Sequence, residues 1–467
     1  MTLCHHSRAL LLTALTACSS SASHAPARVD VSDIPSATEL GRPAPAVTVP
    51  VPATAPTTKQ VPVTATAPVP VPVPATTTVP AATTVPVPAT AHNFIAEAEL
   101  LFRIAACGSD TPLPASLSER DVRIINEHCS AIAKRMAKYR KSYMAEAQPF
   151  LATLVPQNIP STVVYPFGGG DLLSALVAFP KATSIATVSL ELAGDPRRIT
   201  TLQGDALRHS LGALRAQIGG LLSVGSNTSE NLSAQQRNDL PGQVSSFMLG
   251  LATVGATPVA MRYFAIADDG SLRYLADADI TAADTAGRAA LASRRKASWQ
   301  SPNFSEAFAN VEIEFRMPGE TNHRVHRHIG WNLANDYLAA HPQLIAFFGT
   351  LAQPRVTVLV KGASYLLWRP DFATIRSWLL ANLAWMLSDS TGIPPRFAQA
   401  AGMTQTTYGD YDGAFLAGAE EGWPQHTDDF RHIWRTQPHR RLPFRFGYVD
   451  AHKQAHLVVT APGATAP

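Results

Sequence analysis

The sequence predicts an α/β domain built on a mixed β-sheet, with parallel strands first and antiparallel strands later. Between residues 161 and 191, an apolar run, a glycine-rich turn, a helix-like stretch and a second apolar run follow one another, as in a βαβ unit. Residues 311–317 alternate between apolar and charged positions, which is typical of a half-buried strand, and we expect this strand to form an antiparallel hairpin with residues 324–331. Residues 355–360, RVTVLV, form an apolar run that predicts a buried strand.

Composition separates this domain from a long N-terminal segment. The chain has 467 residues, 37 prolines, 16% charged residues and a formal net charge of +3. Residues 1–92 hold 15 of the prolines but only 7 charged residues, so the remaining 375 residues have the composition of a globular domain. Their net charge of +2 carries no electrostatic footprint for nucleic acid, and we expect no nucleic-acid partner.

Residues 1–18 predict an export signal. Residues 9–17 are apolar but too few to span a bilayer as a mature helix. They end in Leu-Thr-Ala before Cys18, which resembles the lipobox of bacterial lipoproteins. The resemblance implies that Cys18 carries acyl chains such as palmitate and anchors the protein to a membrane. Because Ser19 rather than Asp follows, it implies the outer membrane of the cell envelope; the alternative is an ordinary secretory signal that contains a cysteine.

Residues 19–92 predict a disordered tether rich in Pro, Thr, Val and Ala. Each proline fixes its own φ angle and favours extended backbone in the residue before it. At about 3.1 Å per residue, the stretch from Pro43 to Ala89 would reach roughly 150 Å. Such a reach suits a domain that meets a partner in the cell envelope; the alternative is a plain spacer without a binding role.

Residues 93–160 predict a helical N-terminal segment closed by a disulfide. Cys107 and Cys129 form an even pair in an exported domain, which favours a bond between them. The bond would connect a helix over residues 94–106 to a long helix over residues 118–147 and stabilise the fold by about 3 kcal/mol. A catalytic thiol is the alternative, although no Cys-His-Asn signature surrounds either cysteine.

A glycine-rich turn inside the predicted βαβ unit is the first candidate ligand-binding site. It consists of Gly168, Gly169, Gly170 and Asp171, and Glu191 ends the second strand 23 residues after its first glycine. Glycines after a strand let the backbone approach a ligand, and an acidic residue at that separation suits a ribose hydroxyl. The alternative is a structural turn in which Asp171 caps the helix that follows.

These residues resemble the opening of Rossmann-like proteins, and more closely that of class I methyltransferases dependent on S-adenosylmethionine. The resemblance implies a Rossmann-like sheet flanked by helices over residues 161–467. Two departures weaken the implied nucleotide site: the loop reads G-G-G-D rather than G-x-G-x-G, and residues 165–167 (Tyr-Pro-Phe) stand where an acidic residue would end the first strand. The cofactor stays unknown.

The histidines of the predicted hairpin are weak candidates for a metal site. His326 and His328 face the same side of a strand, and Glu312 or Glu314 across the hairpin would supply the third ligand that a catalytic zinc needs. The alternative is a polar outer face on which the histidines, glutamates and arginines pair across strands. Because the interleaved arginines repel a cation, we predict no metal.

A polar loop after a predicted helix over residues 371–387 is the candidate catalytic site. Asp389 and Ser390, followed by Thr391, are similar to the D-[ST]-G motif of aspartic proteases, with one extra residue. The alternative is a helix-terminating loop that stops at Gly392.

Four longer segments resemble uncharacterised exported bacterial proteins that carry a Y-P-F-glycine segment: VVYPFGGGDLLSAL, TVSLELAGDP, KGASYLLW and SDSTGIPP. We therefore expect a cell-envelope lipoprotein that presents an α/β domain on a tether for a binding or envelope-associated role. The alternative is a small-ligand enzyme with a methyltransferase-like or hydrolase-type site around Gly168–Asp171, Glu191 and Asp389. Convergence of these segments in space would favour a ligand site.

Overall fold

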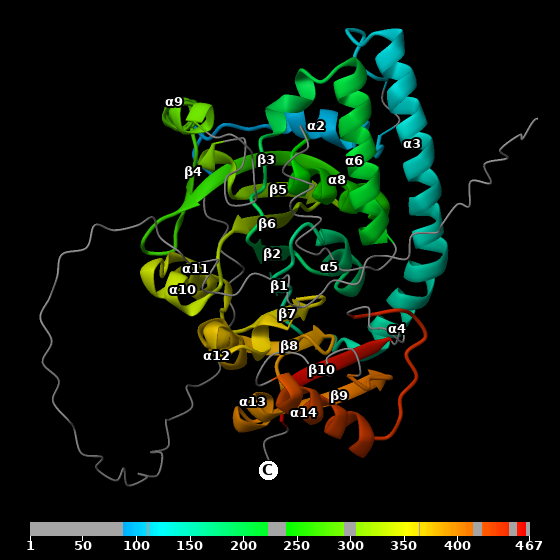
Figure 1. The fold of residues 1–467 in the computed structure, drawn as a ribbon, viewed down its shortest axis with the longest axis vertical. Coiled ribbons are helices and arrows are strands. Elements are labelled where there is room, and N and C mark those ends of the chain that lie inside the picture. The colour runs from blue at the N-terminus through cyan, green and yellow to red at the C-terminus, as the bar shows by residue number, and fades with distance from the viewer. Residues whose placement is uncertain are drawn as a thin grey trace, which may run out of the picture. The chain divides into compact units, whose positions relative to one another are not determined.

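One ten-stranded mixed sheet runs through the domain (Figure 1). The computed structural model describes residues 87–109, 112–222, 240–293, 305–363, 365–413, 423–447 and 455–463, so the signal segment, Cys18 and most of the tether lie outside the described residues. The spatial order is β4-β3-β5-β6-β2-β1-β7-β8-β10-β9. The strands are β1 (Thr162–Pro166), β2 (Ser184–Ser189), β3 (Thr257–Ile266), β4 (Leu272–Tyr274), β5 (Val311–Arg316), β6 (Arg324–Gly330), β7 (Val356–Val360), β8 (Leu383–Ser388), β9 (Met403–Gly409) and β10 (His456–Pro462).

The α/β class and the mixed sheet are confirmed, but the predicted order of parallel strands first and antiparallel strands later is wrong, because β7 and β8 follow antiparallel strands and pair in parallel. The central strands β6, β2, β1, β7 and β8 pair in parallel, and the outer strands pair antiparallel on both sides of them. The expected βαβ unit is present as β1, α5 and β2, and the expected antiparallel hairpin is β5 with β6.

Helices cover both faces of the sheet (Figure 1). One face carries α2 (Ile95–Ile104), α3 (Glu119–Tyr139), α5 (Leu172–Ala178), α6 (Gly204–Leu222) and α8 (Gly242–Val254). The other carries α10 (Asn335–Ala340), α11 (Gln343–Leu351) and α12 (Ala373–Asn382). The remaining α-helices are α4 (Ala145–Leu154), α9 (Asp277–Ser293), α13 (Pro395–Ala400) and α14 (Trp423–Thr436).

Residues on each central strand alternate between two cores. Val163 and Tyr165 of β1 point into the core beneath α5 and α8, whereas Val164 points into the core beneath α11 and α12. Strands buried on both faces require nearly continuous apolar sequence, and this is why β1 and β7 are recognisable as short apolar runs.

The strand order reverses between β1 and β7. From β1 the chain crosses to β2 through α5 on one face, and from β7 it crosses to β8 through α12 on the other face. Because the two connections diverge, neither of them covers the carboxyl ends of both β1 and β7. This is the place where open α/β sheets bind ligands.

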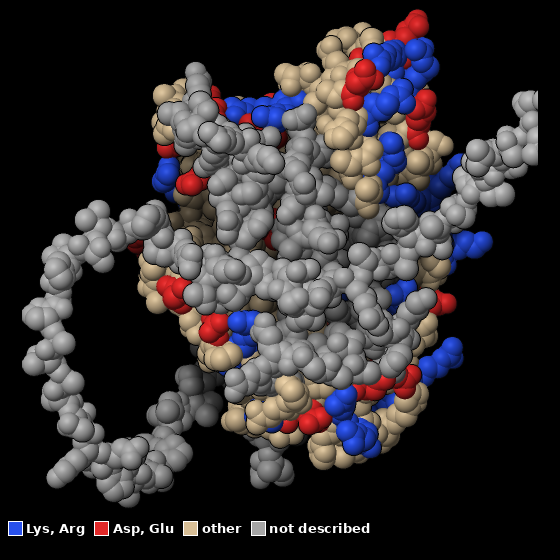
Figure 2. Space-filling model, viewed as in Figure 1, with Lys and Arg blue, Asp and Glu red and all other residues tan. Residues whose placement is uncertain are grey.

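The N-terminal segment is helical, as predicted, but its helices run differently. Ser118 caps α3 by accepting a hydrogen bond from the Asp121 N–H at 3.1 Å. A π-helical turn, η2 (Arg140–Met144), then leads directly into α4, and Pro149 lies inside α4 instead of ending the helix. On the outer surface of α3 acidic and basic side chains alternate (Figure 2), and Glu127 pairs with Arg208 of α6 at 3.2 Å.

The predicted helix over residues 371–387 is wrong beyond Asn382. The helix α12 begins after its N-cap residue Phe372, and residues 383–388 form β8 instead. Trp385 and Leu387 face one core while Leu383 and Met386 face the other, so β8 is apolar almost throughout. An apolar run of this length does not distinguish a strand from a buried helix by its periodicity.

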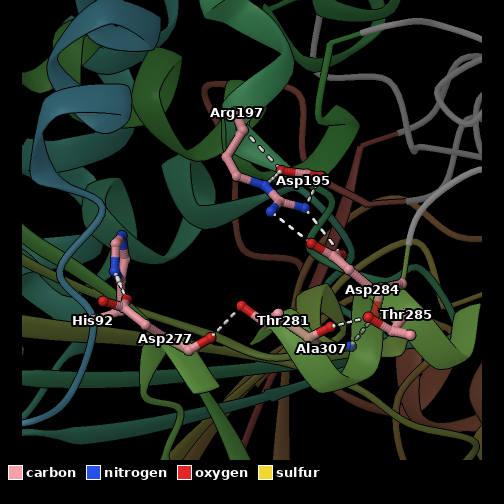
Figure 3. Close-up of polar contacts among 9 residues, drawn as sticks. His92, Asp195, Arg197, Asp277, Thr281, Asp284, Thr285 and Ala307 are labelled. Carbon is pink, nitrogen blue, oxygen red and sulfur yellow. Dashed lines mark hydrogen bonds and ion pairs between the residues drawn. The ribbon is translucent and has the colours of Figure 1, made fainter. Parts of the chain in front are cut away.

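An arginine clamp fixes the connection after β2 to α9 (Figure 3). Arg197, in the 3-10 turn η3 (Pro196–Thr200), donates to Asp195 at 2.7 Å and to Asp284 of α9 at 2.8 Å. Its guanidinium group also stacks 4.5 Å from the centre of the Phe308 ring. In the same view His92 pairs with Asp277 at the start of α9, so the last residues assigned to the tether lie against the domain.

The predicted disulfide between Cys107 and Cys129 is present, with 5.4 Å between the Cα atoms. We expect a Cys107→Ala/Cys129→Ala variant to lose about 3 kcal/mol of unfolding free energy, because the bond restricts a loop of 22 residues in the unfolded chain. Chemical denaturation without reductant measures this loss. The variant should be insensitive to dithiothreitol, and a loss below about 1 kcal/mol would contradict the expectation.

Candidate functional site

Four loops meet at the carboxyl edge of the parallel strands. The Gly168 N–H after β1 donates to the Val188 carbonyl of β2 at 3.0 Å, and the Asp389 N–H after β8 donates to the Val360 carbonyl of β7 at 3.2 Å. The glycine turn, Glu191 and Asp389 therefore all lie along one edge. They form two groups of contacts, which the residues directly after β7 link: Lys361 contacts Asp171, and the Gly362 N–H donates to Asp389.

The glycine turn fits between Glu191 and the first turn of α8. Gly169 has a φ angle of +50°, and a Cβ atom built on it would lie 3.5 Å from Glu191 Oε1. A Cβ atom on Gly170 would lie 2.5 Å from Gln243 Oε1, closer than a side chain tolerates. The positive φ angle thus favours glycine at position 169, and Gly170 leaves room for the end of the Gln243 side chain, which would have to move for a larger residue.

Glu191 presents a buried carboxyl group at this turn. The side chain is almost fully enclosed, and burial raises its pKa, an effect that a hydrogen bond from Ser189 partly offsets. Among the described residues no basic side chain lies within 4 Å of this carboxyl group. A desolvated carboxyl group that has no basic neighbour among the described residues and faces glycine backbone has the properties expected of a ligand-binding group.

Asp171 has the structural role that the alternative prediction gave it, as the cap of the helix that follows. Its carboxylate caps α5 by accepting from the Ser174 N–H at 3.0 Å and also accepts from the Tyr165 hydroxyl at 3.1 Å. Lys361 lies 3.4 Å from the same carboxylate and donates to the Ser174 hydroxyl at 3.0 Å. Sequence reasoning missed Lys361, although a charged residue directly after the apolar run of β7 was an available signal.

The zinc hypothesis fails because the acidic residues lie on the other face. His328 is opposite Val311 and His326 is opposite Ile313, so Glu312 and Glu314 point away from both histidines. Instead, the Glu312 carboxylate accepts hydrogen bonds from Arg327 and Tyr274. Within the part of the chain that the structure describes, no group of three or more His, Cys, Asp or Glu residues is arranged to hold a metal ion.

The alternative of a polar outer face is also wrong for the histidines, which are fully buried beneath Phe247 of α8. His328 Nε2 lies 2.7 Å from the Glu191 backbone carbonyl, which only accepts, so this nitrogen carries the proton. Nδ1 of neutral His328 then accepts from the Thr187 hydroxyl at 3.0 Å, and Thr187 in turn accepts from His326 Nε2 at 2.9 Å. One hydrogen-bonded chain thus leads from inside the sheet to the Glu191 backbone.

Asp389 connects the loops after β7 and β8. Its carboxylate accepts from the Gly362 N–H at 2.9 Å, the Thr391 N–H at 2.8 Å and the Thr391 hydroxyl at 2.5 Å. These three donors hold the side chain between two loops, as in a structural turn. The predicted helix-terminating loop is wrong in one respect, because the loop follows strand β8 and not a helix.

Ser390 has a neighbour that the sequence did not indicate. Its hydroxyl lies 2.9 Å from His456 Nε2 and 3.2 Å from the Tyr365 hydroxyl. A histidine at this distance is the arrangement that activates a serine nucleophile. The Ser390 and His456 side chains are both fully buried, however, and the Trp368 ring nitrogen donates to the Ser390 carbonyl. His456 begins β10, and only the antiparallel pairing of β10 with β8 brings it here.

Backbone strain concentrates at the same edge. Phe167 after β1 and Tyr365 after β7 have φ angles of 60° and 62°, and Cys107 is the only other described non-glycine residue with positive φ. Each such residue costs of the order of 1–3 kcal/mol, which the surrounding structure must offset, and strain of this kind gathers at functional sites. Phe167 and Tyr365 lie on the two sides of the strand-order reversal, which agrees with a functional site at that place.

Comparison with protein-family models, curated proteins and solved structures finds no match to this chain. A search of the described helices for one long and apolar enough to cross a membrane also finds none.

The buried histidines make the stability of the domain pH-dependent. Burial lowers the pKa of His328 to about 4, whereas the unfolded chain titrates near 6.5. The unfolded state therefore binds the proton first, and the stabilisation is present above pH 6.5 and is lost as the pH falls towards 4. We expect His328→Gln to reduce the loss of unfolding free energy between pH 7 and pH 5 by about 2 kcal/mol.

Urea denaturation at the two pH values measures this difference. His432→Gln is the matched control, because His432 is an exposed histidine on α14 and should leave the pH dependence unchanged. Identical pH dependence of the wild type and His328→Gln would refute the expectation.

Proposed function

We propose that this chain is an exported, lipid-anchored protein whose α/β domain binds a small neutral ligand with adjacent hydroxyl groups. The site is the carboxyl edge of β1 and β2. The observation that carries the proposal is the buried Glu191 carboxyl group, which faces the side-chain-free backbone of Gly169. The strand-order reversal and the two strained residues beside it support the same place.

Charge at this edge favours hydroxyl groups over phosphate. Glu191 and Asp171 are both acidic, and Lys361 is already paired with Asp171. The N-terminus of α5, a helix of only seven residues, is capped by Asp171 and is thus not open to an anion. A carboxyl group binds hydroxyl donors strongly, so a sugar or the ribose of a nucleoside fits this chemistry. The Rossmann-like resemblance supports the position of the ligand, whereas the charge argues against nucleotide phosphates.

The exported location rests on the lipobox and the disulfide. Disulfides persist in oxidising compartments such as the cell envelope and are rare in the cytosol. The Cys107–Cys129 bond therefore agrees with export, and the sequence before it supplies the signal, the lipidation site at Cys18 and the tether. The proposed partner is thus a membrane, reached through the lipid, with the ligand site carried on the domain.

Ligand-observed NMR on the full chain in detergent tests the site. The probes are N-acetylglucosamine, adenosine and ATP, which separate sugars, nucleosides and phosphates. We expect N-acetylglucosamine or adenosine to bind, and we expect the phosphates of ATP to add no affinity over adenosine. Glu191→Gln should weaken binding roughly 10- to 150-fold, because it replaces a hydrogen bond to a charged group. An enzyme acting at this edge would convert the bound probe, and product resonances would appear.

Glu146→Gln is the control for this experiment, because Glu146 is exposed on α4, remote from the carboxyl edge. Failure of both neutral probes to bind would overturn the proposal. So would binding that Glu191→Gln leaves unchanged while the variant stays folded by circular dichroism.

The lipid anchor has a separate test. Cells that express the full chain should incorporate labelled palmitate into it, and Cys18→Ala should abolish incorporation because the acyl acceptor is lost. Cys4→Ala is the matched control, since this cysteine lies in the same signal segment ahead of the lipobox. Absence of label in the wild type would contradict the anchor, and label that survives Cys18→Ala would place it elsewhere.

A further inference from the structure

A cavity opens at the opposite, amino-terminal edge of the sheet. It lies between the end of α4, the connection from α4 to β1 and the end of α5, and it has a volume of about 150 Å³. Val163 of β1 and Phe179 after α5 line its inner part. It shares no residue with the loops that carry Glu191 or Asp389, so it is a different site from the ligand site proposed above.

Small and rigid residues keep this cavity open. Three alanines, Ala152, Ala178 and Ala182, line it where larger side chains would fill it. Its wall also includes three prolines, residues 156, 160 and 180, whose fixed φ angles limit collapse of the backbone. A preformed apolar cavity binds at a lower entropic cost than one that must open.

One charged group lies at the cavity. Lys181 is exposed there, and its nearest described polar contact is Gln157 Oε1 at 3.5 Å, near the limit for a hydrogen bond. Among the described residues no carboxylate lies within 4 Å of its ammonium group. The cavity therefore combines an apolar interior with one positive charge that has no acidic partner.

We infer that this cavity binds a short-chain monocarboxylate, with its hydrocarbon part against Val163 and Phe179 and its carboxylate at the Lys181 ammonium group. The size supports this class, because an engineered apolar cavity of about 150 Å³ in another protein holds benzene. A hydrocarbon part of about six carbon atoms is thus the appropriate length. The positive charge selects a carboxylate over a neutral or cationic head group.

Saturation-transfer NMR on the full chain tests this inference with three probes of equal length: hexanoate, hexanol and hexylamine. We expect hexanoate to bind with a dissociation constant on the order of 1 mM, which suits so small a ligand. Hexylamine should bind at least fivefold more weakly, because Lys181 repels its ammonium group. Hexanol should fall between the two.

Two surface variants locate the site without disturbing the core. Ala152→Phe should abolish hexanoate binding, because Ala152 is exposed on α4 and a phenyl ring there fills the cavity from outside. Lys181→Gln should weaken hexanoate binding about two- to fivefold, the range of an exposed ion pair, and leave hexanol unchanged. Lys141→Gln, at an exposed lysine outside the cavity lining, is the matched control.

Each other outcome overturns part or all of the inference. Hexanoate binding that survives Ala152→Phe would show that the ligand lies elsewhere. Equal affinity for the three probes would contradict a carboxylate as the head group. If deletion of residues 43–86 were needed before hexanoate bound, the valine- and proline-rich tether of the same chain would be the occupant instead.

Discussion

The buried ion pair between Lys361 and Asp171 joins the two halves of the sheet where the strand order reverses. The connections from β1 and β7 leave on opposite faces, so neither of these two connections spans the ends of both strands. Lys361 reaches across this gap to Asp171, and Tyr165 and Ser174 supply further hydrogen bonds to the pair. Because burying two charges is costly, such a pair persists where its hydrogen bonds are satisfied, and removing one partner leaves the other charge unpaired. The glycine turn, the α5 cap and the end of β7 all take their positions from it.

This constraint also explains why Glu191 differs from Asp171. Both are acidic residues in loops at the same edge and both are almost fully buried. Asp171 is held by a cation, a hydroxyl group and a helix N-terminus, whereas the side chain of Glu191 has Ser189 as its hydrogen-bonding neighbour and the bare backbone of Gly169 in front of it. The histidine chain through Thr187 is anchored on the backbone carbonyl of Glu191, so the residue is fixed at its main chain while its carboxyl group faces the turn.

The parts of the fold and of the carboxyl edge that depend on residues close together in the chain were predictable from the sequence. The βαβ unit, the hairpin of β5 and β6 and the Asp171 cap all depend on neighbours within about 20 residues, and the two cysteines are 22 apart. The contacts that complete the edge are not local. Lys361 meets Asp171 across 190 positions and His456 meets Ser390 across 66, because strand order and register bring them together. β8 was missed because both of its faces are buried, which removes the alternation that marks a half-buried strand.

Helix α5 connects the two proposed binding regions, because one of its ends lies at the ligand site near Glu191 and the other at the cavity. Asp171 caps its first turn at the carboxyl edge of the sheet, and Ala178 and Phe179 at its last turn line the cavity at the amino-terminal edge. All seven residues of the helix are buried, and Leu173 lies against Gly250 of α8, where an added Cβ atom would approach the Leu173 backbone nitrogen to 3.3 Å. A helix packed this closely cannot shift at one end alone, since protein interiors leave little free volume. A ligand that displaces Phe179 must therefore either leave α5 in place or move α5 together with its Asp171 cap. The ion pair between Asp171 and Lys361 opposes a movement of the helix.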